Sequence, residues 1–141
     1  MKKIIFVGLV LLGFTSTSFA QSKTPIAVTT AFNQKFPNAT NVKWDKENAH
    51  EYEASFEWKA EKHSANFTDK GEWLETESPL TFSQLPNKVQ TAYKTLYKET
   101  AIKAVAKIET SKGDTKYEIE LKKGLKTMEL FYKNDGTVIK E

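Results

Sequence analysis

The sequence predicts an α+β fold in which two α-β-β-β-β units, arranged in tandem, form an antiparallel sheet with the helices packed on one face. Three observations predict this fold. A helical segment opened by proline occurs twice, a run of alternating strands follows each copy, and the two copies keep the same order along the chain. Clean alternation predicts a sheet with one face buried and the other in water.

The first twenty residues have the three parts of a secretory signal peptide. Met1-Lys2-Lys3 is basic, residues 4–14 are apolar or glycine, and Ser18 and Ala20 are the small residues before a cut at Gln21. The apolar run is too short to span a bilayer, which takes about 20 apolar residues. We therefore expect residues 1–20 to be removed and the mature chain to be periplasmic or secreted.

The amino-acid composition argues against several further classes of function. The chain has no Cys and no Arg, and 21 Lys stand against 18 acidic residues. Without Cys the chain cannot form disulfides, do thiol chemistry or carry a lipoprotein lipid. Without Arg it lacks the guanidinium fork that recognises phosphate and duplex bases. Since the mature chain is also nearly neutral, we expect no nucleic-acid partner.

Each unit begins with a helix. Thr24 suits the capping position, Pro25 suits the first helical position, and Pro37 ends the segment. A second segment opens at Pro86, with its apolar residues displaced from those of the first by a constant offset. Such stripes at helical spacing are interpreted as core. The apolar positions are Val28, Ala31, Phe32 and Phe36 in the first copy and Val89, Ala92, Tyr93, Leu96 and Tyr97 in the second.

After each helix the pattern changes to a period of two, which is typical of strands. Turn signals follow, as in Asp69-Lys70-Gly71 and Asn134-Asp135-Gly136. The expected domain limits are 21–80 and 81–141. The expected strands are 42–46, 52–58, 63–68 and 72–75 in the first copy, and 104–108, 117–121, 128–132 and 137–139 in the second.

The strands and turns also resemble a known family. Tyr52 to Phe56, Phe67 to Leu74 and Leu130 to Val138 are similar to the PepSY-like, β-lactamase-inhibitor-like exported proteins of Bacteroidetes. The resemblance covers almost the whole mature chain. It implies tandem helix-plus-sheet units and a binding or inhibitory role, and it assigns no contact residues to this chain.

Metal chemistry is not expected. His50 and His63 lie near Glu51, Glu53 and Glu61, but they have no ligand spacing and form no HExxH motif. By alternation His63 shares the face of Phe67, so it is interpreted as a packed or rim histidine. Glycine-rich phosphate loops are also missing, and no cofactor is predicted.

Catalysis is not expected either, because no nucleophile motif occurs. Glu53 and Glu57 are four apart and Glu118 and Glu120 are two apart, so each pair shares a strand face, where solvated surface is the usual explanation. The chain is therefore predicted not to be an enzyme. An envelope enzyme using strand carboxylates stays the weakest alternative, which a raised carboxylate pKa in a cleft would favour.

The remaining feature is the polar face of the sheet. Phe131 is out of phase with its apolar neighbours, so it is expected on that face beside Glu129, either as an exposed interface anchor or packed under a loop. The sequence therefore predicts a non-enzymatic binding module of the cell envelope, inhibitor- or sensor-like, that recognises a protein or peptide through Phe131, Glu129, Glu118 and Glu120. The alternative is a small-molecule or glycan binder that uses Trp44, Trp58 and Trp73 as stacking surfaces.

Overall fold

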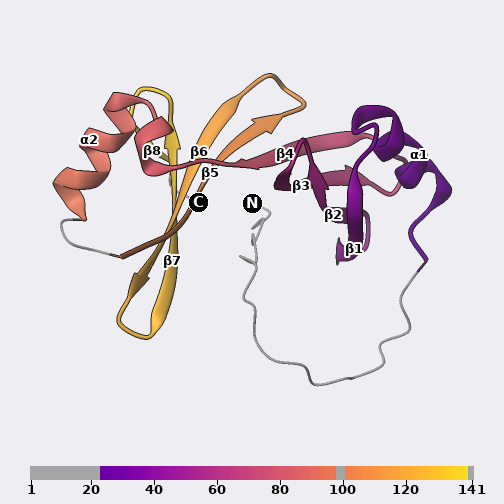
Figure 1. Ribbon diagram of the computed structural model, residues 1–141, viewed down its shortest axis with the longest axis horizontal. Coiled ribbons are helices and arrows are strands. Elements are labelled where there is room, and N and C mark those ends of the chain that lie inside the picture. Colours follow the sequence, from indigo (N-terminus) through magenta and orange to yellow (C-terminus); the bar gives the residue numbers. More distant parts are fainter. Residues whose placement is uncertain (1–22, 98–100, 140–141) are drawn as a thin grey trace.

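The computed structural model describes residues 23–97 and 101–139, so the predicted signal peptide lies outside the described residues. In the described part of the chain, no helix is long and apolar enough to cross a membrane. Two helices and eight strands make up the fold (Figure 1). They are α1 (Ile26–Lys35), β1 (Thr40–Asn48), β2 (Glu51–Trp58), β3 (Glu61–Thr68), β4 (Trp73–Pro79), the short 3-10 helix η1 (Phe82–Gln84), α2 (Asn87–Leu96), β5 (Ala101–Thr110), β6 (Thr115–Lys123), β7 (Lys126–Lys133) and β8 (Val138–Ile139).

The strands form one antiparallel sheet in which their order in space is their order along the chain. Short turns join all neighbouring strands except β4 and β5, between which η1 and α2 intervene. The predicted α+β class is confirmed, and the element order of residues 26–79 is repeated in residues 87–139. The domain limits of 21–80 and 81–141 remain predictions.

Both helices start one residue later than predicted. Pro25 and Pro86 are the N-caps, with extended ψ angles of 145° and 140°, and neither helix has a side-chain cap. Thr24 is therefore not the cap. The Pro25 carbonyl accepts the first helical hydrogen bond from the Thr29 amide and also one from the Val28 amide, which satisfies one of the free N–H groups at the helix start.

The helical stripes are core, as predicted, except at Leu96, which is 63% exposed near the end of α2. In the first half, the Phe32 ring lies 4.9 Å from Phe56 and 5.3 Å from Trp44, both edge to face. Such aromatic contacts stabilise a core beyond the area that they bury. In the second half, Val89 and Tyr93 pack on β5, β6 and β7. The first cluster comprises Val28, Phe32, Phe36, Tyr52, Ala54, Phe56, Ala65 and Phe67.

Strand register shows that both helices cover the same face. Ala54 pairs with Ala65, Ala65 with Thr76, and Thr76 with Glu109, so the side chains of one face can be followed from the first half into the second. Figure 1 shows α1 and α2 at opposite ends of the sheet. No described helix lies on the other face, which we call the open face.

Two turns that contain glycine pack closely against the helices. Gly71 and Gly136 have positive φ angles of 85° and 84°, and a Cβ on them would lie 2.5 Å from the Ala27 oxygen and 2.6 Å from the Lys88 oxygen. Only glycine fits where a positive φ coincides with so close an approach of backbone. The turn of each half therefore packs on the first turn of the helix of the same half.

Candidate functional site

Carboxylates gather on the open face of the sheet. Glu53 on β2 pairs with Asn66 on β3, which in turn pairs with Glu75 on β4. Since residues two apart on a strand share a face, Glu77 lies on this face as well. We call these carboxylates, with those of the second half, the acidic strip. It comprises Glu53, Glu75, Glu77, Glu118, Glu120 and Glu129.

The structure brings the four predicted binding residues together. Glu118 on β6 lies opposite Phe131 on β7, and Glu120 lies opposite Glu129. Phe131 is on the predicted face and is only 6% exposed, so of the two alternatives the exposed anchor is wrong and Phe131 is packed. The strand pairing explains the burial, because Phe131 has Glu118 on one side and Ile139 of β8 on the other. A role of these four residues in binding remains a prediction.

The strip carboxylates are not the freely solvated surface that the sequence suggested. Glu118 is 8% exposed, and the side chains of Glu120 and Glu75 are 15% and 16% exposed. Lys103 forms an ion pair with Glu120, and the Lys116 ammonium lies 3.8 Å from the Glu75 carboxylate. These carboxylates are held in place by paired strands rather than free in water, so they form an ordered acidic surface.

Burial and mutual repulsion raise two carboxyl pKa values. Burial raises the pKa of Glu77 to about 7, and the charges of nearby Glu75, Glu129 and Glu120 add to the effect. Burial raises the pKa of Glu53 to about 8, together with a hydrogen bond to Glu47 and the charges of neighbouring carboxylates. Near neutral pH both groups therefore hold a proton for much of the time, which limits repulsion within the strip.

Sequence reasoning missed Glu75 and Glu77 as site residues. It ended the last strand of the first half at Glu75, whereas β4 runs on to Pro79. The signal was present, because Glu75 and Glu77 alternate with Thr76 and Ser78 at the strand period. Extending the strand by that period would have put both carboxylates on the open face.

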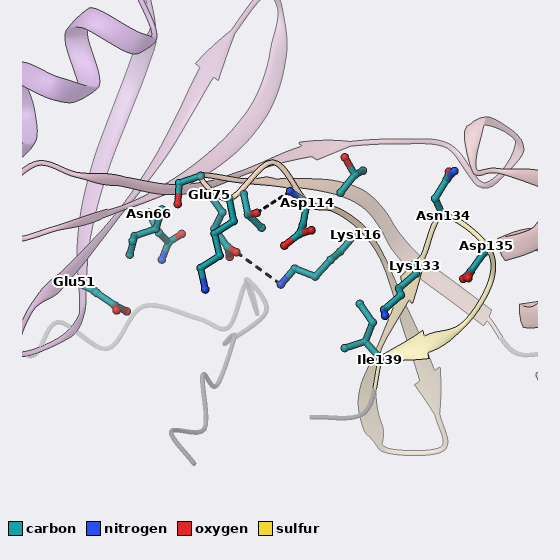
Figure 2. A pocket seen from close by; sticks show the side chains of 14 residues that line it. Glu51, Asn66, Glu75, Asp114, Lys116, Lys133, Asn134, Asp135 and Ile139 are labelled. Carbon is teal, nitrogen blue, oxygen red and sulfur yellow. Dashed lines mark hydrogen bonds and ion pairs between the residues drawn. The ribbon is translucent and has the colours of Figure 1, made fainter.

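A hollow of about 790 Å³ opens at one end of the acidic strip, between the two halves of the sheet. Figure 2 shows Glu51 and Asn66 on one side of it and Lys133, Asn134 and Asp135 on the other. The exposed lining residues of the β5–β6 and β7–β8 turns form its rim. We call its less exposed charged and amide residues the floor, namely Glu51, Asn66, Glu75 and Lys116; Thr110 and Thr115 lie beside them.

The three tryptophans belong to the first core rather than to an exposed platform. Trp44, Trp58 and Trp73 are partly buried and pack against the first core cluster. The indole N–H of Trp58 donates to the Pro37 carbonyl, and the Lys35 ammonium lies 3.5 Å above the Trp73 ring. The exposed cluster that a glycan site would use is therefore not formed by these residues.

His63 is a packed histidine, as predicted. Its side chain is 7% exposed and its ring stacks on Phe56 at 5.8 Å. His50, by contrast, is exposed and forms an ion pair with Asp69 at 3.0 Å. The hydrogen bond from His50 lowers the pKa of the Asp69 carboxyl. Within residues 23–97 and 101–139, no group of three or more His, Cys, Asp or Glu side chains could hold a metal ion.

The raised pKa of Glu53 and Glu77 is one of the two features that the enzyme alternative required. The other was a cleft, and neither residue lines the hollow. What the arrangement offers is an ordered, acidic and partly apolar face with a polar hollow at one end. Such a surface is suited to recognising a partner rather than to moving a proton onto a bound substrate.

Comparisons with known proteins agree with the fold. The family model described as "Putative beta-lactamase-inhibitor-like, PepSY-like" matches residues 14–64 and 50–140. A BLIP-like protein from Bacteroides fragilis is 25% identical, with a TM-score of 0.67 over 81% of this chain and 82% of that chain. No curated protein matches the sequence significantly.

Two further solved structures share the fold at lower identity. A DUF2874 family protein from Bacteroides ovatus is 24% identical, with a TM-score of 0.72 over 84% of this chain and 86% of that chain. A structure from Bacteroides eggerthii, described as "putative periplasmic proteins", is 18% identical, with a TM-score of 0.76 over 84% and 87%. Both likenesses concern the arrangement of the helices and the sheet.

Proposed function

The chain belongs to the PepSY-like, beta-lactamase-inhibitor-like family, and on this basis we propose that it is an exported, non-catalytic binding module of the cell envelope that recognises a protein or peptide through the open face of its sheet. The predicted signal peptide supports export. The likeness to a BLIP-like protein supports an inhibitor- or sensor-like role for that binding.

The observation that carries the proposal is the contrast between the two faces of the sheet. One face is filled by the apolar sides of α1 and α2. The other has no described helix over it, yet Phe131 and Glu118 on it are less than a tenth exposed and its carboxylates are ordered. An ordered surface costs little further side-chain entropy when a partner binds, which favours recognition.

A protein or peptide fits this face better than a glycan. The tryptophans that would stack on sugars pack against the first core instead. The open face offers fixed carboxylates on neighbouring strands, and such charges select a partner by complementary charge and speed its approach. Glu118, Glu120 and Glu129 are therefore proposed as contact residues, with Phe131 supporting them from within the face.

Affinity capture tests the proposal. The protein is immobilised beside a triple variant, Glu118→Gln, Glu120→Gln and Glu129→Gln, and the retained proteins of the envelope extract are compared. A second triple variant, Glu61→Gln, Glu72→Gln and Glu109→Gln, changes the net charge equally off the open face. We expect one exported protein that the first variant loses and the second retains. Retention by both variants, or loss by both, would contradict recognition through the open face.

A further inference from the structure

Asn66 on the floor of the hollow presents its side-chain amide to the open space. It lies on β3, between β2 and β4, and is 8% exposed. Among the described residues, no hydrogen bond reaches its side-chain amide, which lines the hollow (Figure 2). The amide is open to the hollow, so a group that enters there can bond to it, and asparagine is otherwise disfavoured in strands.

The charges around Asn66 indicate which kind of chemical group would bind in the hollow. Its direct neighbours across the strands are Glu53 and Glu75, and Glu51 also lines the floor. The cation on the floor, Lys116, lies 3.8 Å from Glu75, near the outer limit of an ion pair. Although the whole chain has a formal charge of +3, this part of it is acidic.

The acidic strip continues the floor of the hollow along the sheet. Glu77 is two residues beyond Glu75 on β4, and burial together with the charges of Glu75, Glu129 and Glu120 raises its pKa. The part of this effect that comes from Glu75, Glu129 and Glu120 shows that the strip places several carboxylates near one another, and a cation would relieve their repulsion. Charge complementarity therefore points to a basic partner.

We propose that the hollow receives a lysine or arginine side chain of the partner polypeptide, whose N–H groups donate to the amide oxygen of Asn66 and to the carboxylates of Glu75 and Glu51. This inference rests on the proposed function and adds the chemistry of the anchor. Leu74 and Ile139 also line the hollow and suit the aliphatic stem of such a side chain. Because the hollow of about 790 Å³ exceeds the volume of one side chain, residues flanking the anchor enter as well.

An anionic ligand is less well matched. Lys112 and Lys133 are exposed on the rim, where Asp114 and Asp135 accompany them. The floor, where a ligand loses most of its water, presents an amide and two carboxylates beside a single Lys116. An anion would therefore be drawn to the rim and repelled at the floor.

The test is a titration of the isotope-labelled protein, produced from the full-length chain, with tetralysine. Nε-acetylated tetralysine and tetraglutamate are the matched probes without the positive charge. NMR follows the side-chain amide of Asn66 and the backbone amides of Glu75 and Lys116. We expect saturable shifts at these positions with tetralysine and none with the other two peptides. Shifts with tetraglutamate, equal shifts with the acetylated peptide, or an unmoved Asn66 amide would overturn the proposal.

Two variants distinguish binding from folding. Asn66→Thr removes the amide from the floor, so it should weaken tetralysine binding by about tenfold, while the thermal unfolding midpoint is kept or raised because threonine is favoured in strands. Glu75→Gln should weaken binding similarly, whereas Glu109→Gln, half exposed on the helical face, should leave it unchanged. Unchanged affinity in Asn66→Thr would refute the anchor.

The two proposals can fail separately. If capture finds a partner on the open face but tetralysine does not enter the hollow, the anchor is wrong and the binding function stands. If tetralysine enters the hollow but no partner depends on the open face, the function is wrong while the chemistry of the hollow stands.

Discussion

The Glu77 carboxyl lowers the stability of the folded protein when it is ionised, yet it belongs to the acidic strip of the open face. This carboxyl is packed on the open face among Glu75, Glu120 and Glu129, and burial raises its pKa to about 7. In the unfolded chain the same group would titrate near 4.5. Between these values the folded state binds more protons than the unfolded state, so stability falls as the pH rises through this window.

Glu77→Gln removes this titration without changing the size of the side chain. Below about pH 4.5 the variant should match the wild type, because Glu77 is then neutral in both states. At about pH 8 it should be more stable by about 3 kcal/mol, because the buried charge is gone. Urea unfolding at the two pH values measures the difference.

The control for this comparison is Glu109→Gln. Glu109 forms an ion pair with Lys107 and its side chain is 52% exposed, so its loss should change stability by less than about 1 kcal/mol at either pH. An effect of Glu77→Gln that is the same at both pH values would show that the carboxyl pKa is not raised in the folded protein.

At the scale of elements, the repeated pattern along the chain predicted most of the fold. The helices, the strands and the turns at Gly71 and Gly136 could be predicted because their signals are local, namely spacing, period and turn residues. Helix starts were displaced by one residue, because Pro25 and Pro86 act as N-caps rather than as first helical residues. Strand β4 was cut short, because its end carries charges rather than apolar residues.

The packing of the glycine turns leads to a prediction at this scale. Gly136→Ala should destabilise the protein by about 3 kcal/mol or more, since a positive φ costs about 1–2 kcal/mol and the Lys88 carbonyl must also move. Gly113 has the same φ of 84° with nothing within 4 Å of a Cβ, so Gly113→Ala should cost only the first part. Denaturant unfolding of both variants gives the comparison, and equal losses would contradict the close contact between turn and helix.

At the scale of the whole molecule, the open face depends on pairings between distant strands. Alternation predicted that a polar face exists, and it placed Glu118, Glu120, Glu129 and Phe131 on that face. It could not show that Phe131 is buried there, because the strand that covers its far side, β8, has only two residues. Nor could it show the hollow, whose floor joins Asn66 and Glu75 of the first half to Lys116 of the second.

The burial of polar groups also depends on which strands pair in the whole sheet. Glu53 lies on β2 and Glu77 on β4, and the charge of Glu77 contributes to the raised pKa of Glu53 only because the sheet brings these strands near each other. The unpaired amide of Asn66 follows from the same pairing, since Glu53 and Glu75 flank it on both sides. Local sequence patterns contain no information on such cross-strand surroundings.

Site-specific photo-crosslinking in the exporting cells tests the central claim, recognition through the open face, most directly. A photoreactive phenylalanine analogue replaces Ser55 or Ser64, which pair with each other on the open face, or Thr91, which is exposed on α2. The account predicts one discrete adduct from Ser55 and Ser64 and none from Thr91. The same adduct from Thr91, or an adduct from Thr91 alone, would contradict it.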